Sequence, residues 1–229
     1  MATQSVHWGY SGSEGPEHWG CLSDEYRPCS EGVEQSPVNI AGYETGGGSA
    51  LQFSYPGKAV AARNNGHTVY LDFEPGNILE ICGGAYELQG VHYHSPGEHE
   101  VDGEQFAAEL HLVHQDPSGN LAVVGLLFRL GAASPLVQDL LDAAPDTDST
   151  NELADGPVAS AYVPELRSYF GYAGSLTTPP CSEGVRWIVM QSVGTVSQEQ
   201  VDRLQSITGG PNNRPVQEIG ARTISAIAG

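Results

Sequence analysis

The chain has 229 residues, enough to bury a sizeable core, and its 28 acidic residues against nine basic ones give a formal net charge of −19. Nucleic acid and anionic membranes are poor partners for such a field, and no stretch approaches the roughly 18 apolar residues of a membrane helix. The acidic residues are spread along the chain, which is typical of a solvated, self-repelling surface; adaptation to high salt is the alternative.

We expect a single domain over residues 1–229, with a flexible N-terminus at residues 1–6, because sheet proteins of this length are commonly single domains. Strand signals dominate: short β-branched or aromatic runs, several of them alternating, are separated by Gly, Pro, Asn and Asp. Residues 42–50 and 146–157 are expected to form surface loops. The predicted strands lie at residues 58–65, 67–73, 77–82, 85–94, 105–114, 121–130 and 185–193.

Two helices are predicted by the residues at their ends. The first, in SPLVQDLLDAA, has Ser134 as its N-cap, and the proline that follows stands at the first helical position. The second, in SQEQVDRLQSI, has a capping box between Ser197 and Gln200, and Gly209 provides a stop.

Five of the eight histidines lie between positions 92 and 114. Because successive side chains of a strand point to opposite faces, His92 and His94 project from the same face. A polar segment follows, and its turn at Asp102-Gly103 predicts a long hairpin whose second strand brings His111 beside the first two. Three imidazoles on neighbouring strands form the open arrangement in which tetrahedral zinc keeps its fourth position for water.

Two carboxylates accompany these histidines. Glu109 shares a strand face with His111, and Glu98 lies in the connection, so either could orient a ligand imidazole or a hydroxyl near the metal. A lone strand histidine is more often a hydrogen-bonded core residue, and we expect that role for His99 and His114, which lie in the loop or at the wrong parity. The spacing of the remaining three histidines favours a metal site.

A family resemblance is carried by six segments in chain order: HWGYSGSEGPEHWG, QSPVNI, NNGHTVYLDF, VHYHSPGEHEVDGEQFAAELHLVH, GSLTTPPCSEGVRWIV and NNRPVQ. The chain resembles the α-class carbonic anhydrases, of the bacterial or extracellular type, over essentially its whole length. The resemblance implies a mainly β fold with peripheral helices, built on a large twisted, mostly antiparallel sheet of about ten strands. It also implies Zn²⁺ as the cofactor, bound by His92, His94 and His111.

By this resemblance the protein is a carbonic anhydrase, which hydrates carbon dioxide reversibly to bicarbonate and a proton by attack of zinc hydroxide on CO₂. Thr177 and Glu98 occupy the places of the residues that orient the hydroxide, and Thr178 lies beside them. Without the resemblance, the TTPP segment would be read as an extended loop, because residues before proline avoid helix. Matching positions for the CO₂ pocket, which fit core packing equally well, are Val113, Val123, Leu176 and Trp187.

The proton must leave through a group that titrates near neutral pH, as histidine does. His67 matches the proton shuttle of the family, although an exposed surface histidine is the alternative. Tyr10, Asn64 and Asn65 match polar residues that order the connecting waters, and Asn212 matches a residue whose backbone carbonyl holds a ligand imidazole.

One position departs from the family pattern. Gly90 stands where many relatives carry a glutamine bonded to the first ligand. His92 therefore needs another acceptor, which leaves its orientation less fixed than that of His111.

The four cysteines form no CxxC motif, and an even number favours disulfides in an exported protein. By resemblance, Cys29 and Cys181 match the pair bridged in extracellular and bacterial relatives. Cys21 and Cys82 have no such match, so a second bridge and two buried thiols remain alternatives. The expected location is periplasmic or extracellular, with the signal peptide absent from this chain because it has been removed.

The expected partners are the small molecules CO₂ and bicarbonate, and a homodimer is left open. Two other functions compete: a carbonic-anhydrase-like binding domain without catalysis, which typically lacks a ligand histidine, and a different zinc hydrolase such as an esterase. This chain keeps all three histidines with Glu98 and Thr177, which favours the enzyme. Weak esterase activity is expected as a side reaction, so CO₂ hydration is the activity that discriminates.

Overall fold

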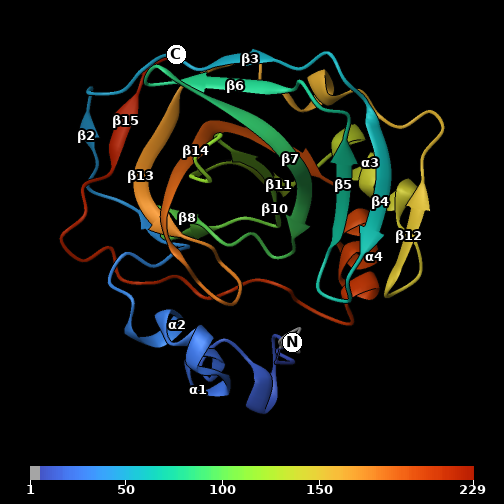
Figure 1. Ribbon diagram of the computed structural model, residues 1–229, viewed down its shortest axis with the longest axis horizontal. Helices are drawn as coiled ribbons and strands as arrows, with labels where there is room; N and C mark the ends of the chain where they lie inside the picture. The colour runs from blue at the N-terminus through green and yellow to red at the C-terminus, as the bar shows by residue number, and fades with distance from the viewer. Residues whose placement is uncertain (1–5) are drawn as a thin grey trace.

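The computed structural model describes residues 6–229, and its main feature is one large sheet that curves around the centre of the molecule (Figure 1). Residues 1–5 of the expected flexible N-terminus lie outside the described part. The strands are β1 (Asn39–Ile40), β2 (Glu44–Thr45), β3 (Gln52–Ser54), β4 (Ala59–Asn64), β5 (Val69–Phe73), β6 (Ile78–Ile81), β7 (Gly84–His94), β8 (Glu100–Val101), β9 (Glu104–Gln105), β10 (Ala108–Gln115), β11 (Leu121–Leu130), β12 (Ser149–Glu152), β13 (Tyr169–Ser175), β14 (Glu183–Val196) and β15 (Ser225–Ile227).

The sheet is mostly antiparallel. Its continuous path runs β12-β4-β5-β7-β10-β11-β14-β13-β15-β2, and β3 and β6 join beside β7, which makes 12 strands within residues 6–229. Among the described strands of this large sheet, only the pairs β11–β14 and β15–β2 are parallel. A small second sheet contains β1, β8 and β9. The predicted mainly β fold on a large, mostly antiparallel sheet is confirmed.

Both predicted helices are confirmed. Helix α3 (Pro135–Ala143) begins after Ser134, whose hydroxyl accepts a hydrogen bond from the backbone N–H of Val137. Helix α4 (Gln198–Thr208) has the predicted capping box. Its C-cap, Gly209, has a φ of 74°, a left-handed conformation that glycine adopts without steric strain.

Two single-turn helices, α1 (Trp19–Leu22) and α2 (Pro28–Glu31), were not predicted, because their segments are too short to show helical periodicity. They pack around the fully buried Trp19, outside the sheet (Figure 1). No helix among residues 6–229 combines the length and apolar character that crossing a membrane requires. Short 3₁₀ helices are η1 (Gly12–Glu14), η2 (Asp24–Tyr26) and η3 (Ala159–Tyr162).

Alternation along β7 and β10 separates the two faces of the sheet. Val91 and Tyr93 of β7 and Leu110 and Leu112 of β10 are fully buried in the main core. The apolar side chains of α3 and α4 belong to the same core. The intervening residues of both strands therefore project to the opposite face, where the candidate site lies.

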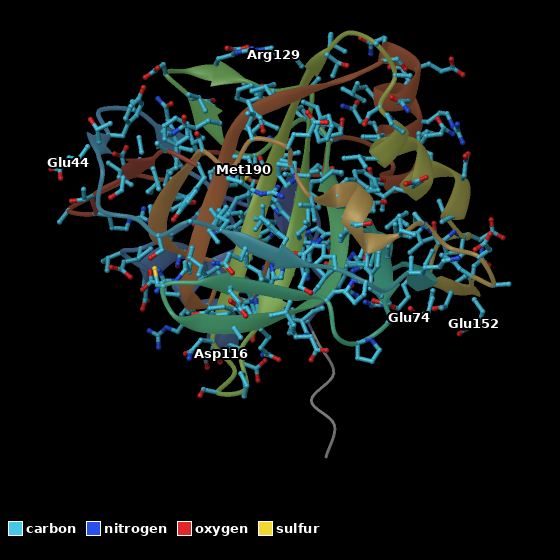
Figure 2. The ribbon with its side chains drawn as sticks, turned by 90° about the horizontal axis from the view of Figure 1, so that it is seen from above. Glu44, Glu74, Asp116, Arg129, Glu152 and Met190 are labelled. Atoms are coloured by element: carbon cyan, nitrogen blue, oxygen red, sulfur yellow. A yellow bond between two sulfur atoms is a disulfide. The ribbon has the colours of Figure 1, made fainter. Side chains whose placement is uncertain are left out.

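The two segments expected to be surface loops each contain a short strand. β2 lies within residues 42–50 and β12 within residues 146–157, and every residue of both strands is exposed. Neither has an apolar alternation that could predict a strand, since each forms by pairing at an edge, β2 with β15 and β12 with β4. Figure 2 shows Glu44 of β2 and Glu152 of β12 on opposite sides of the molecule.

Cys29 and Cys181 form a disulfide across a sequence separation of 152 residues, as the resemblance implied. Cys21 and Cys82 are exposed free thiols. Both alternatives considered for them, a second bridge and two buried thiols, are therefore wrong. Cys82 is exposed because it occupies the tight turn between β6 and β7, where its φ is 52°.

Opening the disulfide should destabilise the fold. Because it closes a loop of 152 residues, the chain-entropy model gives about 5 kcal/mol of stabilisation. We expect Cys29→Ser to lower the melting temperature by on the order of 10 °C, as measured by circular dichroism. Cys21→Ser is the matched control and should leave it unchanged, because Cys21 is exposed and unbridged. Equal melting temperatures for the two variants would contradict this expectation.

Candidate metal centre

Three histidines converge on the sheet face opposite α3 and α4. His92 and His94 lie on β7, and His111 lies on β10, directly opposite His92 in the antiparallel register. One ring nitrogen of each histidine lies within 4.8 Å of those of the other two. The predicted hairpin is confirmed, because β8 and β9 pair on either side of Asp102 and Gly103, which both have positive φ.

Two of the three rings are held from behind by the protein. Nδ1 of His94 donates to the backbone carbonyl of Asn212 at 2.7 Å, and Nε2 of His111 donates to Oε1 of Glu109 at 2.9 Å. These bonds fix the tautomers and leave Nε2 of His94 and Nδ1 of His111 with lone pairs for a metal. Nε2 of His94 is buried and has no hydrogen-bond partner in the protein, the environment that a metal-binding nitrogen needs.

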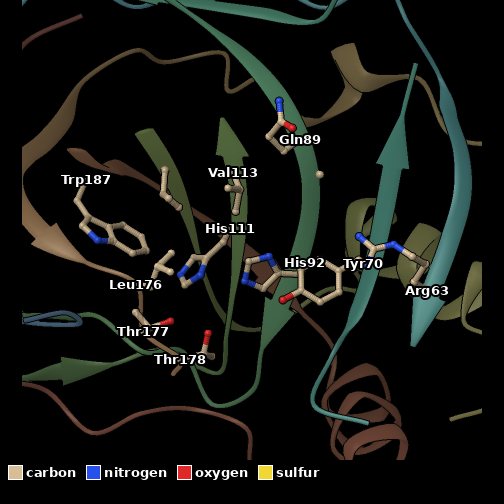
Figure 3. A pocket seen from close by; sticks show the side chains of 12 residues that line it. Arg63, Tyr70, Gln89, His92, His111, Val113, Leu176, Thr177, Thr178 and Trp187 are labelled. Carbon is tan, nitrogen blue, oxygen red and sulfur yellow. The ribbon is translucent and has the colours of Figure 1, made fainter. Parts of the chain in front are cut away.

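His92 differs because, among residues 6–229, no group accepts a hydrogen bond from its outer nitrogen, the ring nitrogen that faces away from the metal position. Figure 3 shows its ring extending from β7 towards His111, with Nε2 at the tip of the ring. Nδ1 is buried and has no hydrogen-bond partner. Gly90, two residues earlier on the same strand, offers no side chain that could accept a bond from it.

The donor set fits zinc. All three histidines are more than nine-tenths buried, and burial lowers the pKa of each, that of His94 to about 4. They therefore stay neutral, which is the form that binds a metal. Three neutral nitrogens leave one tetrahedral position for another ligand, the arrangement of catalytic rather than structural zinc sites.

Glu109 lies in a buried network behind His111. Its carboxylate accepts hydrogen bonds from the backbone N–H groups of Glu98 and His99 and from the rings of His99 and His111. Burial alone would raise the pKa of Glu109, but the two histidines and these bonds hold it well below its usual range. The ionised carboxylate orients His111 and makes it a more basic ligand.

Glu98 lies beside the three histidines and has one unused oxygen. Its Oε1 accepts a hydrogen bond from the backbone N–H of Arg214 at 2.8 Å, whereas Oε2 is buried and accepts none. Burial raises the pKa of Glu98 to about 7, against the opposing effects of His111, the Arg214 N–H and the Thr177 hydroxyl. Because Oε2 has no partner, it can accept a further hydrogen bond. The Thr177 hydroxyl, which lowers the pKa of Glu98, is a donor close to this carboxylate.

A cavity of about 260 Å³ opens in front of the histidines. His92 and His111 line it together with Thr177 and Thr178, so the two threonines face the metal position (Figure 3). The apolar residues of the predicted substrate pocket all line the same cavity: Val113, Val123, Leu176 and Trp187. Such an apolar wall can hold a small uncharged molecule next to a metal.

The opposite wall contains Arg63, Tyr70 and Gln89, which the sequence analysis missed. Arg63 donates two hydrogen bonds to Asp72 and lies over the ring of Tyr70. Tyr70 packs against the ring of His92, with centroids 4.7 Å apart. The β5–β7 register places Tyr70 opposite His92, and no local pattern in the sequence reveals that register.

His67 lies between β4 and β5 and outside the lining of this cavity. Its ring stacks on Trp8 with centroids 3.8 Å apart, and the ring of His7 lies 6.4 Å away. The residue is partly buried, and this burial, reinforced by His7, lowers the pKa of His67. His67 is thus ordered against an aromatic partner rather than free on the surface.

Asn64 and Asn65 fix the turn that carries His67. The Asn64 side chain donates to a backbone carbonyl and accepts from the backbone N–H of Gly66. Oδ1 of Asn65 accepts from the backbone N–H groups of His67 and the residue after it. These bonds give both amides a structural role, and their role in ordering water stays a prediction.

Asn212 connects this turn with the metal centre. Its backbone carbonyl accepts from His94, as the resemblance implied, and its side-chain amide donates to the backbone carbonyl of His67. The ring of Tyr10 lies edge-on to His67 with centroids 6.2 Å apart. Tyr10 and Asn212 are therefore both placed beside the expected proton shuttle.

The other two histidines of the cluster have the structural roles that were predicted. The ring of His99 is hydrogen-bonded to Glu109 on one side and to Tyr172 on the other. His114 is bonded to the Tyr55 hydroxyl and to a backbone carbonyl of β11. Both are completely buried.

Fold and site together define a β-sheet protein with three convergent, buried histidines that could hold a metal ion. The family model for eukaryotic-type carbonic anhydrases matches residues 14–228. The carbonic anhydrase of Pectobacterium carotovorum is 40% identical over 224 residues, which covers 97% of this chain and 92% of that protein. The chain belongs to the carbonic anhydrase family.

Solved structures agree with this assignment. The α-carbonic anhydrase of Thermovibrio ammonificans, in complex with the inhibitor sulfanilamide, is 39% identical with a TM-score of 0.92, over 97% of this chain and all of that one. A dioscorin in complex with ascorbate is 33% identical with a TM-score of 0.88, over 97% of this chain and 98% of that one. Because both share this fold, the chemistry of the chain must be argued from its site.

Proposed function

We propose that the protein is a zinc enzyme that hydrates carbon dioxide reversibly to bicarbonate and a proton. The observation that carries the proposal is the complete set of three neutral, buried histidines at the base of a partly apolar cavity. Zinc bound there would lower the pKa of a coordinated water, as is established for this family. The roles of the surrounding residues follow from their contacts.

Thr177 and Glu98 orient the attacking water. The Thr177 hydroxyl donates to Oε2 of Glu98, the buried oxygen that otherwise accepts no hydrogen bond. The threonine oxygen is then left as an acceptor for a proton of the water, which aims a lone pair of the water at the substrate. Thr178 faces the same cavity and contacts the substrate or the product.

The apolar wall holds CO₂ and keeps other water away from it. CO₂ has no net charge or dipole, so it gains little from polar contacts and can be held loosely beside the nucleophile. Val113 and Val123 are paired across β10 and β11, which fixes this part of the wall on rigid strands. Leu176 and Trp187 complete it.

His67 takes the proton that the reaction releases. Its ring lies outside the cavity lining, so the proton reaches it through water, past Tyr10 and Asn65. Its lowered pKa keeps the imidazole neutral, and so able to accept a proton, at a lower pH than an ordinary histidine.

A binding protein that has lost catalysis is the second candidate, since the dioscorin structure shows a protein of this fold in complex with ascorbate. The complete histidine set, with its orienting groups Asn212 and Glu109, favours the enzyme. Weak hydrolysis of activated esters is a side reaction of the same site.

Periplasmic or extracellular residence is part of the proposal. The bridge between Cys29 and Cys181 supports it, because disulfides persist in oxidising compartments and are rare in the cytosol.

CO₂ hydration, followed by stopped flow on metal-analysed protein, tests the proposed function. We expect one zinc per chain, loss of activity after removal of the metal with a chelator, and recovery on adding one equivalent of zinc. Full hydration activity without metal, or one zinc per chain without hydration activity, would contradict the proposal.

A further inference from the structure

A β-bulge lies next to the first histidine of the metal centre. On β10, Val113 pairs with Gly90 and His114 pairs with Leu88, so Gln89 has no partner and is the extra residue of β7. As a result, both Gln89 and Gly90 face the cavity, where a regular strand would present only one of them. Bulges next to active sites commonly redirect a side chain in this way.

The strand beside this bulge passes close to Gly90. A β-carbon at position 90 would lie 3.0 Å from the backbone carbonyl oxygen of Leu71 on β5. That contact is tight but involves a single atom, and the φ of Gly90 lies outside the left-handed region. The position could therefore carry a side chain after a small shift, and as a glycine it lines the cavity with its backbone alone.

The N–H group of His92 that faces away from the metal position has no acceptor. When Nε2 binds the metal, Nδ1 carries the proton, and this atom is buried without a hydrogen-bond partner. A buried unsatisfied donor destabilises the folded protein, so it is normally paired with a protein group or ordered water. The equivalent atoms of His94 and His111 bond to Asn212 and Glu109.

Among residues 6–229, no neighbouring side chain accepts a hydrogen bond from this atom. Gln89 donates its amide to the backbone carbonyl of Glu87 rather than turning towards His92. Both carboxylate oxygens of Asp72 accept from Arg63. Tyr70 contacts His92 with the face of its ring, at an interplanar angle of 39°.

We propose that a bound water molecule, rather than a protein side chain, accepts the hydrogen bond of His92 Nδ1, so that Gly90 makes His92 the least constrained of the three metal ligands. This inference rests on the proposed zinc function. Two imidazoles are fixed by the protein and the third is oriented by exchangeable solvent. Gly90 thus sets how tightly the metal is retained, because outer partners of ligand histidines typically contribute 10–100-fold to metal affinity.

Proton NMR of the zinc-loaded wild-type protein tests the inference directly. The outer N–H protons of His94 and His111 are held by Asn212 and Glu109 and should exchange slowly with water. That of His92 should exchange at least about tenfold faster, because its partner is itself water. Three equally protected ring N–H signals would overturn the inference while leaving zinc binding, and so the proposed function, intact. Absence of zinc binding would overturn both.

Zinc release into excess chelator tests the consequence with a matched pair of variants. Gly90→Gln adds an acceptor that can reach Nδ1, and Gly90→Met adds a side chain of similar length without one. Both meet the same Leu71 carbonyl, so the strain is common to them. We expect Gly90→Gln to release zinc about tenfold more slowly than Gly90→Met. Equal rates would overturn the inference.

A third variant examines Gln89, the other candidate acceptor. If the Gln89 amide turned to accept from His92 Nδ1 once the metal was bound, Gln89→Leu would remove that acceptor. Zinc release should then become about 10–100-fold faster. The inference expects the Gln89→Leu and wild-type rates to agree within about twofold. A tenfold acceleration would assign the role to Gln89 and overturn the role of solvent.

Discussion

Replacing His94 with alanine should remove most of the zinc and nearly all CO₂ hydration. Among the three proposed ligands, His94 is firmly fixed by the protein, because it is almost fully buried and its outer nitrogen is bonded to the Asn212 carbonyl. Loss of an outer partner alone costs 10–100-fold in metal affinity, so loss of the ligand itself should exceed about 100-fold. Zinc per chain, measured by elemental analysis after dialysis, and stopped-flow hydration are the two readouts.

His18→Ala is the matched control for this experiment. The side chain of His18 is about half exposed and pairs only with the neighbouring Glu17, far from the metal centre in the sequence and outside the cavity lining. It should keep full zinc content and activity. If His94→Ala also kept both, the metal would lie elsewhere, and the three-histidine assignment would be wrong. A fall in activity at full zinc content would mean that His94 acts on the reaction and not on metal retention.

The metal centre could be predicted because its geometry is local in the sequence. Two histidines two positions apart share a strand face whatever the rest of the fold is. The turn signal at Asp102-Gly103 then returns the chain, and the observed register places His111 opposite His92. Only that register depends on packing, and the alternation of buried leucines on β10 fixes the face of His111.

The opposite wall of the cavity could not be predicted because it depends on contacts between distant segments. Tyr70 faces the metal centre only because β5 pairs with β7 in one register, and Gln89 reaches the cavity only because of a bulge. A glycine inside an apolar strand can mark the close approach of another chain segment, and the sequence contains such glycines. Gly125 of β11 is such a case: a β-carbon there would lie 2.9 Å from Oε1 of Glu109.

Contacts between distant segments also explain why β13, α1 and α2 could not be predicted from the sequence. β13 contains Gly171 and Gly174, which weaken a strand pattern, yet a β-carbon at Gly174 would lie 2.2 Å from the Ser36 hydroxyl oxygen. Gly174 is needed because a neighbouring chain segment packs closely against it. The single-turn helices α1 and α2 likewise form through packing around Trp19 and not through helical propensity.

Replacing His67 with alanine should separate the two halves of the reaction. In the proposed mechanism, attack on CO₂ depends on the metal ligands, Thr177 and the apolar wall, whereas release of the proton depends on His67, which lies outside the cavity lining. In dilute buffer we expect kcat to fall on the order of 10²-fold, the usual contribution of a positioned proton-transfer group. The value of kcat/KM for hydration should stay nearly unchanged, because it covers only the steps up to bicarbonate release.

The pH dependence and a control variant complete this test. If His67 is the proton acceptor, turnover needs its neutral form. Because burial lowers the pKa of His67, wild-type kcat should fall with decreasing pH only below the usual range of histidine titration, near 6.5. The His67→Ala variant should lose this acid limb and recover turnover in imidazole buffer. His7→Ala, which removes the neighbouring exposed imidazole, should keep most of kcat. If kcat and kcat/KM fell together in His67→Ala, the residue would be shaping the site through its stacking on Trp8 and not carrying the proton.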